Sequence, residues 1–448
     1  MRTLKTLTLF FLFVPFTFIS CTKDPDVDEL SAVSSKGKGI GPDRNSKSFQ
    51  LVQNIKIGPE EAAEISAFDP VSNRLFTVNS TIPGITVYDI SDIGNPVKVQ
   101  DIIGLPGAPT SVASNNNGVI AVALEADPSQ DPGSVLLFNT EDLSQIGNAI
   151  QVGPLPDMIT FTPDGTKILV ANEGEPNDDW SDDPEGSVSI IDYPSLSVTT
   201  ADFSGFTYTD ELKNNGFRVF GPIGFDLSLP RNVEPEYIAV SDDSKFAWVS
   251  LQENNGLALV NIEAGSIDDI YPLGFKDYRD PFNAIDPSDR DGNKALRTVP
   301  AFGMYQPDGI AYANIKGQGI IVTANEGDAR DYDAFSEEER VVDLVLDPTA
   351  FPNATDLQLE EKLGRLEITT TLGDTDGDGD YDELYSYGAR SFSIWSESGQ
   401  LIYDSGNDIG QQTLRLTPDR FNDNDGRSDA KGGEPEAVTI LNRKSTRL

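Results

Sequence analysis

Oxygen-bearing side chains and the cations Arg and Lys are the groups with which this chain can do chemistry. It contains no histidine and one cysteine, Cys21, against 73 Asp and Glu residues. The lack of histidine excludes Ser-His-Asp triads, histidine general bases and His-ligated zinc or haem. No GxxxxGK[ST] or GxGxxG stretch follows an expected strand and opens a helix. Carboxylates favour hard cations, and calcium above all.

One acidic run has the spacing of a calcium loop. The stretch DTDGDGDYDE (374–383) alternates carboxylates around glycine turns, with Asp374, Asp376, Asp378, Asp380 and Asp382 as candidate metal ligands. D-x-D-x-D-G loops wrap one calcium ion in this way. Tyr385 stands where a closing Glu is usual, so Glu383 or another loop would have to complete the site. Five carboxylates this close repel one another unless they are neutralised; the alternative is a solvated acidic turn.

A second set of acids recurs at equivalent places in a repeated pattern. Some begin an expected strand, mostly within PD or PE, and others end the next strand, within NE, EGEP or EGDA. The candidate ligand or channel residues are Asp157, Glu173, Glu175, Glu236, Glu253, Asp308, Glu326, Asp328, Glu434 and Glu436. Arg390, Arg330, Lys276 and Lys431 lie in matching loops and could offset their charge. The alternatives are strand-end capping of loop amides, a metal or ligand site, and catalysis.

The pattern that carries these acids is a β-hairpin repeat. Apolar alternation, a polar or Gly-rich turn and a second β-rich run recur at 63–79, 110–125, 156–173, 235–253 and 307–326, more weakly at 389–406, and in part at 435–441. Third strands are expected at 84–91, 186–193 and 256–263. This predicts an all-β, seven-bladed β-propeller over residues 51–448, with long loop insertions and a last blade cut short. A β-sandwich is the competing fold. A ring of equivalent strands would aim the leading acids at one channel.

Other segments carry separate expectations. Ser336 and Glu339 form a capping box before RVVDLVL, which predicts a helix after Phe335. Trp248 and Trp395 lie in β-rich runs and are expected in the core. Trp180 is expected in an exposed loop, with contact to a ligand as the alternative.

The amino terminus has the features of an export signal. Residues 1–20 combine Arg2 and Lys5 with an apolar stretch, and they end at Cys21 in a lipobox-like context. We therefore expect cleavage before Cys21, lipidation of its sulfur, a flexible tether over 21–50, and an outer-membrane lipoprotein facing the periplasm or the cell surface. The alternative is an ordinary signal peptide with an incidental cysteine. The net charge of −40 disfavours nucleic acid and attracts cations.

Several strings resemble the choice-of-anchor I family, which is similar to the mesenchyme-specific cell surface glycoproteins of biomineralising animals. They are PDMITFTPDGTKILVANEGEP (156–176), EPEYIAVSDDSKFAWVSLQENN (234–255), GFKDY (274–278), GMYQPDGIA (303–311), ANEGDARDYD (324–333), LGRLEIT (363–369) and GARSFSIW (388–395). The resemblance implies an exported propeller held at the cell surface by varying anchors, with animal relatives tied to calcified matrix. Some members carry an alkaline phosphatase label. The chain departs from the family by stopping soon after EPEAVTI.

Two functions follow. The first is a lipid-anchored, calcium-binding propeller with a binding or structural role, whose ligand is cationic, glycan, phosphate-bearing or mineral. The second is a calcium-dependent phosphoesterase, alkaline phosphatase- or phytase-like, with Glu236, Asp308 and Arg390 as candidate catalytic residues and Lys276 as a further charge-stabilising group.

Overall fold

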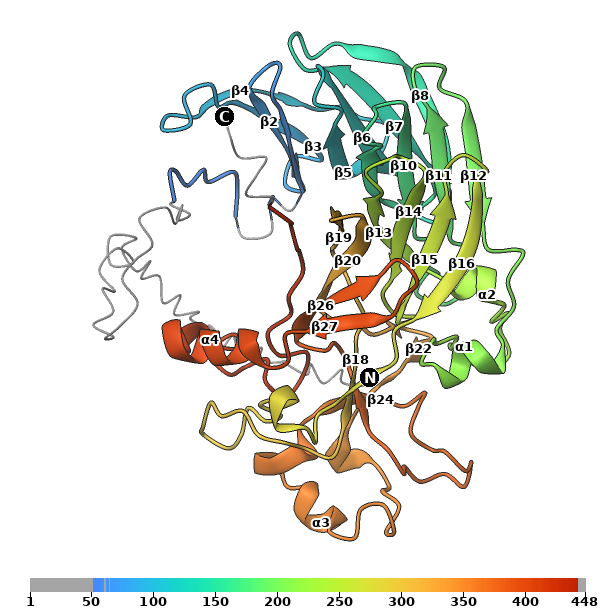
Figure 1. Cartoon of the computed structure of the whole chain (residues 1–448), viewed down its shortest axis with the longest axis vertical. Helices are drawn as coiled ribbons and strands as arrows, with labels where there is room; N and C mark the ends of the chain where they lie inside the picture. The colour runs from blue at the N-terminus through green and yellow to red at the C-terminus, as the bar shows by residue number, and fades with distance from the viewer. Residues whose placement is uncertain (1–50, 60–61, 64, 442–448) are drawn as a thin grey trace, which may run out of the picture. The chain divides into compact units, whose positions relative to one another are not determined.

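Five four-stranded antiparallel sheets contain most of the strands of the structure, a computed structural model that describes residues 51–441 except 60, 61 and 64 (Figure 1). The expected signal, Cys21 and the tether lie outside the described residues. Strands make up 38% and helices 9% of the structure, so the fold is mostly β, as the sequence predicts.

Each of the first four sheets is built from consecutive strands. Their bounds are β1 Ser66–Asp69, β2 Arg74–Asn79, β3 Gly84–Asp89 and β4 Val97–Ile102; β5 Ala108–Ser114, β6 Val119–Glu125, β7 Pro132–Asn139 and β8 Gln145–Pro154; β9 Pro156–Phe161, β10 Lys167–Asn172, β11 Ser187–Asp192 and β12 Val198–Asp202; β13 Pro235–Val240, β14 Phe246–Leu251, β15 Gly256–Asn261 and β16 Ser266–Pro272. The hairpins expected at 63–79, 110–125, 156–173 and 235–253 and the three expected third strands are all present here.

The fifth sheet has the order β19-β20-β26-β27, with bounds β19 Ile310–Ile315, β20 Gln318–Asn325, β26 Ser391–Ser396 and β27 Leu401–Asp404. The sixth repeat copy (389–406) therefore supplies the outer half of this sheet and is no separate blade. The last copy (435–441) has no strand. Seven blades are not confirmed, because the described chain forms five such sheets.

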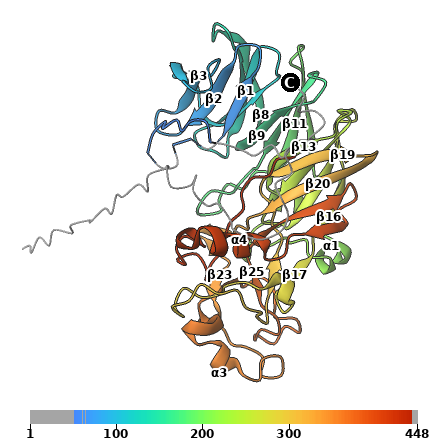
Figure 2. The same cartoon turned by 60° about the vertical axis from the view of Figure 1, so that its left-hand side comes forward.

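Neighbouring sheets adjoin through their first strands, which contact one another in the order β1, β5, β9, β13 and β19. Figures 1 and 2 show the sheets following one another in chain order. Their faces pack together because side chains alternate along each strand. In β6, Ile120 and Val122 pack toward the first sheet, whereas Ala121 and Ala123 pack toward the third.

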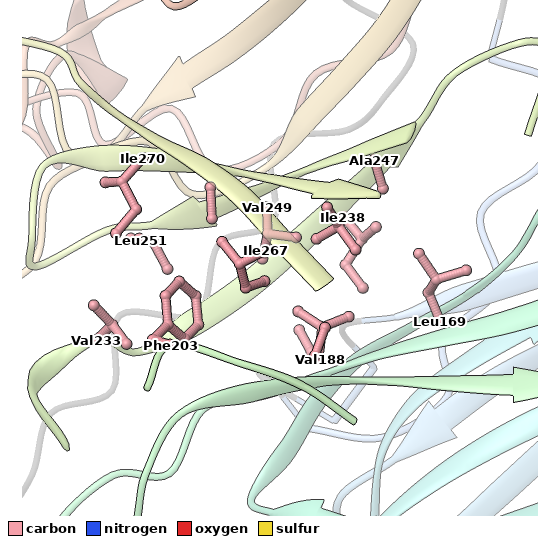
Figure 3. Packing of buried hydrophobic residues seen from close by; sticks show 14 of the residues in the cluster. Leu169, Val188, Phe203, Val233, Ile238, Ala247, Val249, Leu251, Ile267 and Ile270 are labelled. Atoms are coloured by element: carbon pink, nitrogen blue, oxygen red, sulfur yellow. The ribbon is translucent and has the colours of Figure 1, made fainter. Parts of the chain in front are cut away.

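The apolar core therefore lies in layers between sheets. Figure 3 shows the layer between the third and fourth sheets, where Leu169 and Val188 face Ile238 and Val249. The layer between the fourth and fifth sheets contains Trp248 and Trp395, as the sequence predicts, and both indoles are buried.

Insertions form a smaller unit of irregular structure below the fifth sheet in Figure 1. Its strands are β17 Phe275–Asp277, β18 Phe302–Met304 and β25 Tyr385–Ser386; β21 Asp331–Tyr332 and β22 Phe335–Ser336; β23 Glu338–Arg340 and β24 Glu367–Thr369. The α-helices within the described residues are short: α1 Asp210–Asn214, α2 Leu229–Asn232, α3 Ala354–Leu357 and α4 Asp408–Leu416. No described helix has both the length and the apolar character that a bilayer crossing requires.

The prediction of a helix after Phe335 is wrong. This segment forms β22, β23 and a single 3-10 turn at Val341–Asp343. Glu337 is fully buried in an ion pair with Arg218, and Glu338 pairs with Thr369 of β24. Tertiary pairing overrides the local capping signal here. Trp180 does lie in a loop, but the exposure predicted for it is wrong: its indole is 3% exposed and packs edge-on against Tyr332 and Phe335.

Candidate cation site

The antiparallel hairpins bring the recurring acids to one end of the sheets. Asp157 and Glu236 are the second residues of β9 and β13, and Asp308 lies just before β19. Glu173 and Glu253 follow the ends of β10 and β14. Because the start of one antiparallel strand lies beside the end of its partner, both groups of acids share one rim.

We call the five residues Asp157, Glu173, Glu236, Glu253 and Asp308 the acid cluster. Burial is the main cause that raises the pKa of Glu173, Glu236 and Glu253 well above the ordinary value, and neighbouring carboxylates add to it. The charges of Glu253, Glu173, Asp308 and Asp157 together raise the pKa of Glu236, so the acids from three sheets interact. Burial, with repulsion from Glu326, Asp157 and Glu436, raises the pKa of Asp308 to about 7.

Two members of the acid cluster have a carboxylate oxygen without a partner. Glu236 is 8% exposed and Glu253 7% exposed. Within the described residues, Oε2 of each accepts no hydrogen bond. A buried, unbonded carboxylate oxygen is costly unless a proton or a cation neutralises it.

Four other predicted acids lie outside the acid cluster, and three of them contact other side chains. The Tyr332 hydroxyl donates to Glu175 Oε1 at 2.5 Å, and Gln252 Nε2 donates to Glu326 Oε2 at 3.1 Å. Lys431 forms an ion pair with Asp328. Glu436 is exposed, although its charge still raises the pKa of Asp308 and Glu326.

A buried ion pair stands beside the acid cluster. Arg330 Nη2 lies 2.8 Å from Glu234 Oε1, and both side chains are 2% exposed. Arg330 also donates to the carbonyls of Phe220 and Asn232. Burial nevertheless raises the pKa of Glu234 to about 7, with Glu175 opposing the effect of Arg330. The sequence reasoning missed Glu234, although the doubled acid in EPE was the available signal.

The other predicted cations lie elsewhere. Lys276 Nζ is 2.8 Å from Asp404 Oδ1 and donates to the carbonyls of Ala389 and Gly406. Arg390 donates to the carbonyls of Asp286, Ser428 and Ala430. Glu434 forms an ion pair with Arg427 rather than joining the acid cluster.

The predicted calcium loop gathers its acids into two overlapping groups. Asp374, Asp376 and Asp382 place one oxygen each within 4.8 Å of one another, and so do Asp347, Asp380 and Asp382. Asp378 is in neither group, although its charge is the largest cause of the raised pKa of Asp376. Asp347 was missed by the sequence reasoning, because the bridge between Leu346 and Tyr381 that brings it close is a tertiary contact.

Two glycines set the conformation of the loop 374–382. The amides of Gly377 and Gly379 donate to the two carboxylate oxygens of Asp374, at 2.7 and 3.1 Å. Both glycines have positive φ, which a residue with a Cβ adopts less readily. Thr375 donates to Asp382 through its amide and its hydroxyl, and these bonds lower the pKa of Asp382.

Comparison with known proteins gives the family. The model of the choice-of-anchor I domain matches residues 64–448. The chain belongs to the choice-of-anchor I family. Membership indicates a surface-associated or exported protein, in agreement with the resemblance seen in the sequence.

Two individual proteins show more limited similarity to this choice-of-anchor I chain. Gigasin-3a of Magallana gigas is 35% identical over 96 residues, which cover 19% of this chain and 34% of the relative. The chain thus spans about a third of the length of that curated relative. The hydrazine synthase of Kuenenia stuttgartiensis aligns at a TM-score of 0.27 with 14% identity, over 45% of this chain and 65% of that one.

Proposed function

We propose that this choice-of-anchor I protein is a lipid-anchored, calcium-binding protein of the cell surface with a binding or structural role. The proposal rests on one observation, the unpartnered Oε2 atoms of the buried Glu236 and Glu253 within the acid cluster. The adjoining first strands of five sheets support a propeller arrangement in which these acids face a common axis.

Electrostatics supports a cation at the acid cluster. Three of its acids have a pKa raised well above the ordinary value, because burial and neighbouring carboxylates penalise their charged forms. A divalent ion bound between these acids would relieve both the repulsion and the unmet hydrogen-bonding capacity. Calcium is the favoured ion because it takes six to eight oxygen ligands in flexible geometry. The loop 374–382 would supply a second, solvent-exposed site.

The alternative, a phosphoesterase, has less support. Its mechanism needs Arg390 or Lys276 beside a metal-bound phosphate. Both side chains are held by backbone carbonyls or by Asp404, and the largest electrostatic influences on them come from groups outside the acid cluster.

Calcium titration tests the proposal. The purified full chain, stripped with chelator, would be titrated with calcium by calorimetry and followed by thermal melting. We expect heat of binding and a higher melting temperature. The variants Glu236→Gln and Glu253→Gln would each weaken this response, whereas Glu141→Gln, an exposed acid on a loop of the second sheet, would not. An unaltered titration in the two cluster variants would reject the acid cluster as the site.

The lipid anchor is tested separately. In cells, Cys21→Ser would abolish incorporation of labelled fatty acid and move the protein from the membrane fraction to the soluble fraction. Labelling that persists in this variant would refute lipidation at Cys21 while leaving the calcium proposal intact.

A further inference from the structure

A groove with a volume of about 510 Å³ lies between the fourth and fifth sheets, and we call it the aromatic groove. Residues of β14, β15 and β16 line one side of it. The start of β20 and the turn between β26 and β27 line the other side. Its volume lies within the range of small-molecule sites in other proteins. No residue of the acid cluster belongs to its lining, so the aromatic groove is a separate place on the molecule.

The fourth sheet contributes a wall of aromatic and apolar side chains. Phe246, Leu259 and Tyr271 are each half-buried, so part of each side chain is accessible to a ligand. Trp248 lies beneath them and is almost fully covered. Its indole stacks on the ring of Tyr312, with 5.1 Å between the centroids and 9° between the planes. This stacking joins the two sheets at the base of the groove.

The fifth sheet contributes one carboxylate, that of Glu397, which is held in place. Its Oε1 accepts a hydrogen bond from the Tyr312 hydroxyl at 3.0 Å, and its main-chain carbonyl accepts from Trp248 Nε1 at 3.1 Å. Gly319 makes room for the carboxylate, because a Cβ at this position would overlap Glu397 Oε1. Glu397 is exposed, and its Oε2 accepts no hydrogen bond from the described residues, so a ligand can reach it.

The charge that a ligand would meet in the groove is negative. Among the described residues that line it, Glu397 is the only charged one. Asp269 of β16 pairs with Leu259 of β15, which places both side chains on the same face of the fourth sheet. Burial is the largest cause that raises the pKa of Tyr271, and the charges of Asp269, Asp268 and Glu397 add to it. Such a field disfavours anions and attracts cations.

We infer that the aromatic groove binds an organic ammonium ion, that is, an alkylammonium group on an apolar stem, such as the side chain of a lysine. The rings of Phe246 and Tyr271 attract a cation through their electron-rich faces. Glu397 Oε2 can accept a charge-assisted hydrogen bond from a primary ammonium group. Leu259 offers apolar surface to the methylene stem. A metal ion would leave this apolar wall uncovered, whereas an organic cation uses both walls.

Ligand-observed NMR titration of the chelated full chain tests the inference with three probes of similar size: n-butylammonium, n-butanol and butyrate. We expect n-butylammonium to bind at least tenfold more tightly than n-butanol, which is about 1.4 kcal/mol, and butyrate to bind least. Nα-acetyl-lysine methylamide carries the same cationic group on a peptide backbone. Tighter binding of this probe than of n-butylammonium would indicate a lysine of a protein partner, and weaker binding would indicate a free amine.

Two matched sets of variants assign the effect to the groove. Glu397→Gln keeps the shape of the exposed side chain but removes its charge, so the preference for n-butylammonium over n-butanol should be lost. Glu141→Gln removes the same charge from the second sheet and should preserve that preference. Tyr271→Leu should weaken binding of n-butylammonium, whereas Tyr271→Phe keeps the ring and should bind it as the wild type does.

Three results would each overturn the inference. They are equal or tighter binding of n-butanol or butyrate, an ammonium preference that survives Glu397→Gln, and equal binding by Tyr271→Leu and Tyr271→Phe. Chelator is present throughout, so the outcome does not depend on the calcium proposal, and failure of either proposal leaves the other intact.

Discussion

Glu236 and Glu253 are strand-end residues whose carboxylates are buried among other carboxylates. In most β proteins such acids are solvated or bonded to loop amides. Here the burial of several acids together makes protons and cations compete for the same oxygen atoms. The stability of the protein without calcium should therefore depend on pH in an unusual direction.

Asp308 gives this pH dependence a measurable window. Its pKa is raised from 3.8 to about 7, so the folded state holds its proton more tightly than the unfolded chain. Asp308 therefore destabilises the chelated protein increasingly as pH rises from about 4 to about 7. Asp308→Asn should stabilise the chelated protein at neutral pH by roughly 0.5–3 kcal/mol and have little effect near pH 4.

Denaturant unfolding of both proteins across this pH range measures the effect, with Asp419→Asn as the control. A stability difference between Asp308→Asn and wild type that is constant with pH would contradict the explanation. Saturating calcium should reduce the advantage of the variant, because the ion needs the carboxylate.

The ion pair between Arg330 and Glu234 makes a second prediction at the residue scale. Arg330→Met would leave Glu234 buried without its cation, and breaking a buried pair in this way costs about 3–5 kcal/mol. Arg330→Met combined with Glu234→Gln should be less destabilised than Arg330→Met alone. Chemical denaturation of the three proteins measures this, and strict additivity of the two substitutions would refute a direct coupling.

Among the elements, the loop 374–382 depends on Asp382, which belongs to both groups of acids. Asp382→Asn should therefore weaken metal binding by this loop more than Asp378→Asn, because Asp378 is in neither group. Terbium luminescence excited through the neighbouring Tyr381 reports on the loop specifically. Equal loss of signal in the two variants would argue against Asp382 as the shared ligand.

Local sequence patterns predicted the hairpins well because each pairs residues close in the chain. The alternation in 110–125 and 156–173 appears directly as β5–β6 and β9–β10. The segment after Phe335 was predicted wrongly because its partners, Arg218 and Thr369, are distant in sequence. The same reason hid Asp347 as a candidate ligand, since only the bridge between Leu346 and Tyr381 brings it close to the loop.

At the scale of the whole molecule, the net charge of −40 should make stability sensitive to salt. Self-repulsion of a highly charged surface is screened as ionic strength rises. Raising sodium chloride from about 0.01 M to about 0.15 M should raise the melting temperature of the chelated protein. Calcium should raise the melting temperature further at matched ionic strength. An equal effect of sodium and calcium would mean that charge screening alone stabilises the protein.

Counting repeats did not give the number of sheets. The copy at 389–406 has the alternation of a hairpin, but its first strand pairs with β20 of the preceding copy. Sequence periodicity identifies strands and not their partners, so an insertion inside a sheet looks like the start of a new one. The convergence of Asp157, Glu236 and Asp308 could still be predicted, since it depends on the first strands alone.

The insertion within the fifth sheet also sets an order of assembly. Asn325 pairs with Ser391, so β20 must wait for its partner until the whole of 326–390 has been made. The first four sheets consist of consecutive strands and can pair as they emerge from the ribosome or a secretion channel. During that interval β20 has an open edge, the kind of surface to which a chaperone binds or from which an aggregate grows. A cell that exports this protein would then need its chaperones most while residues 326–390 are still being delivered.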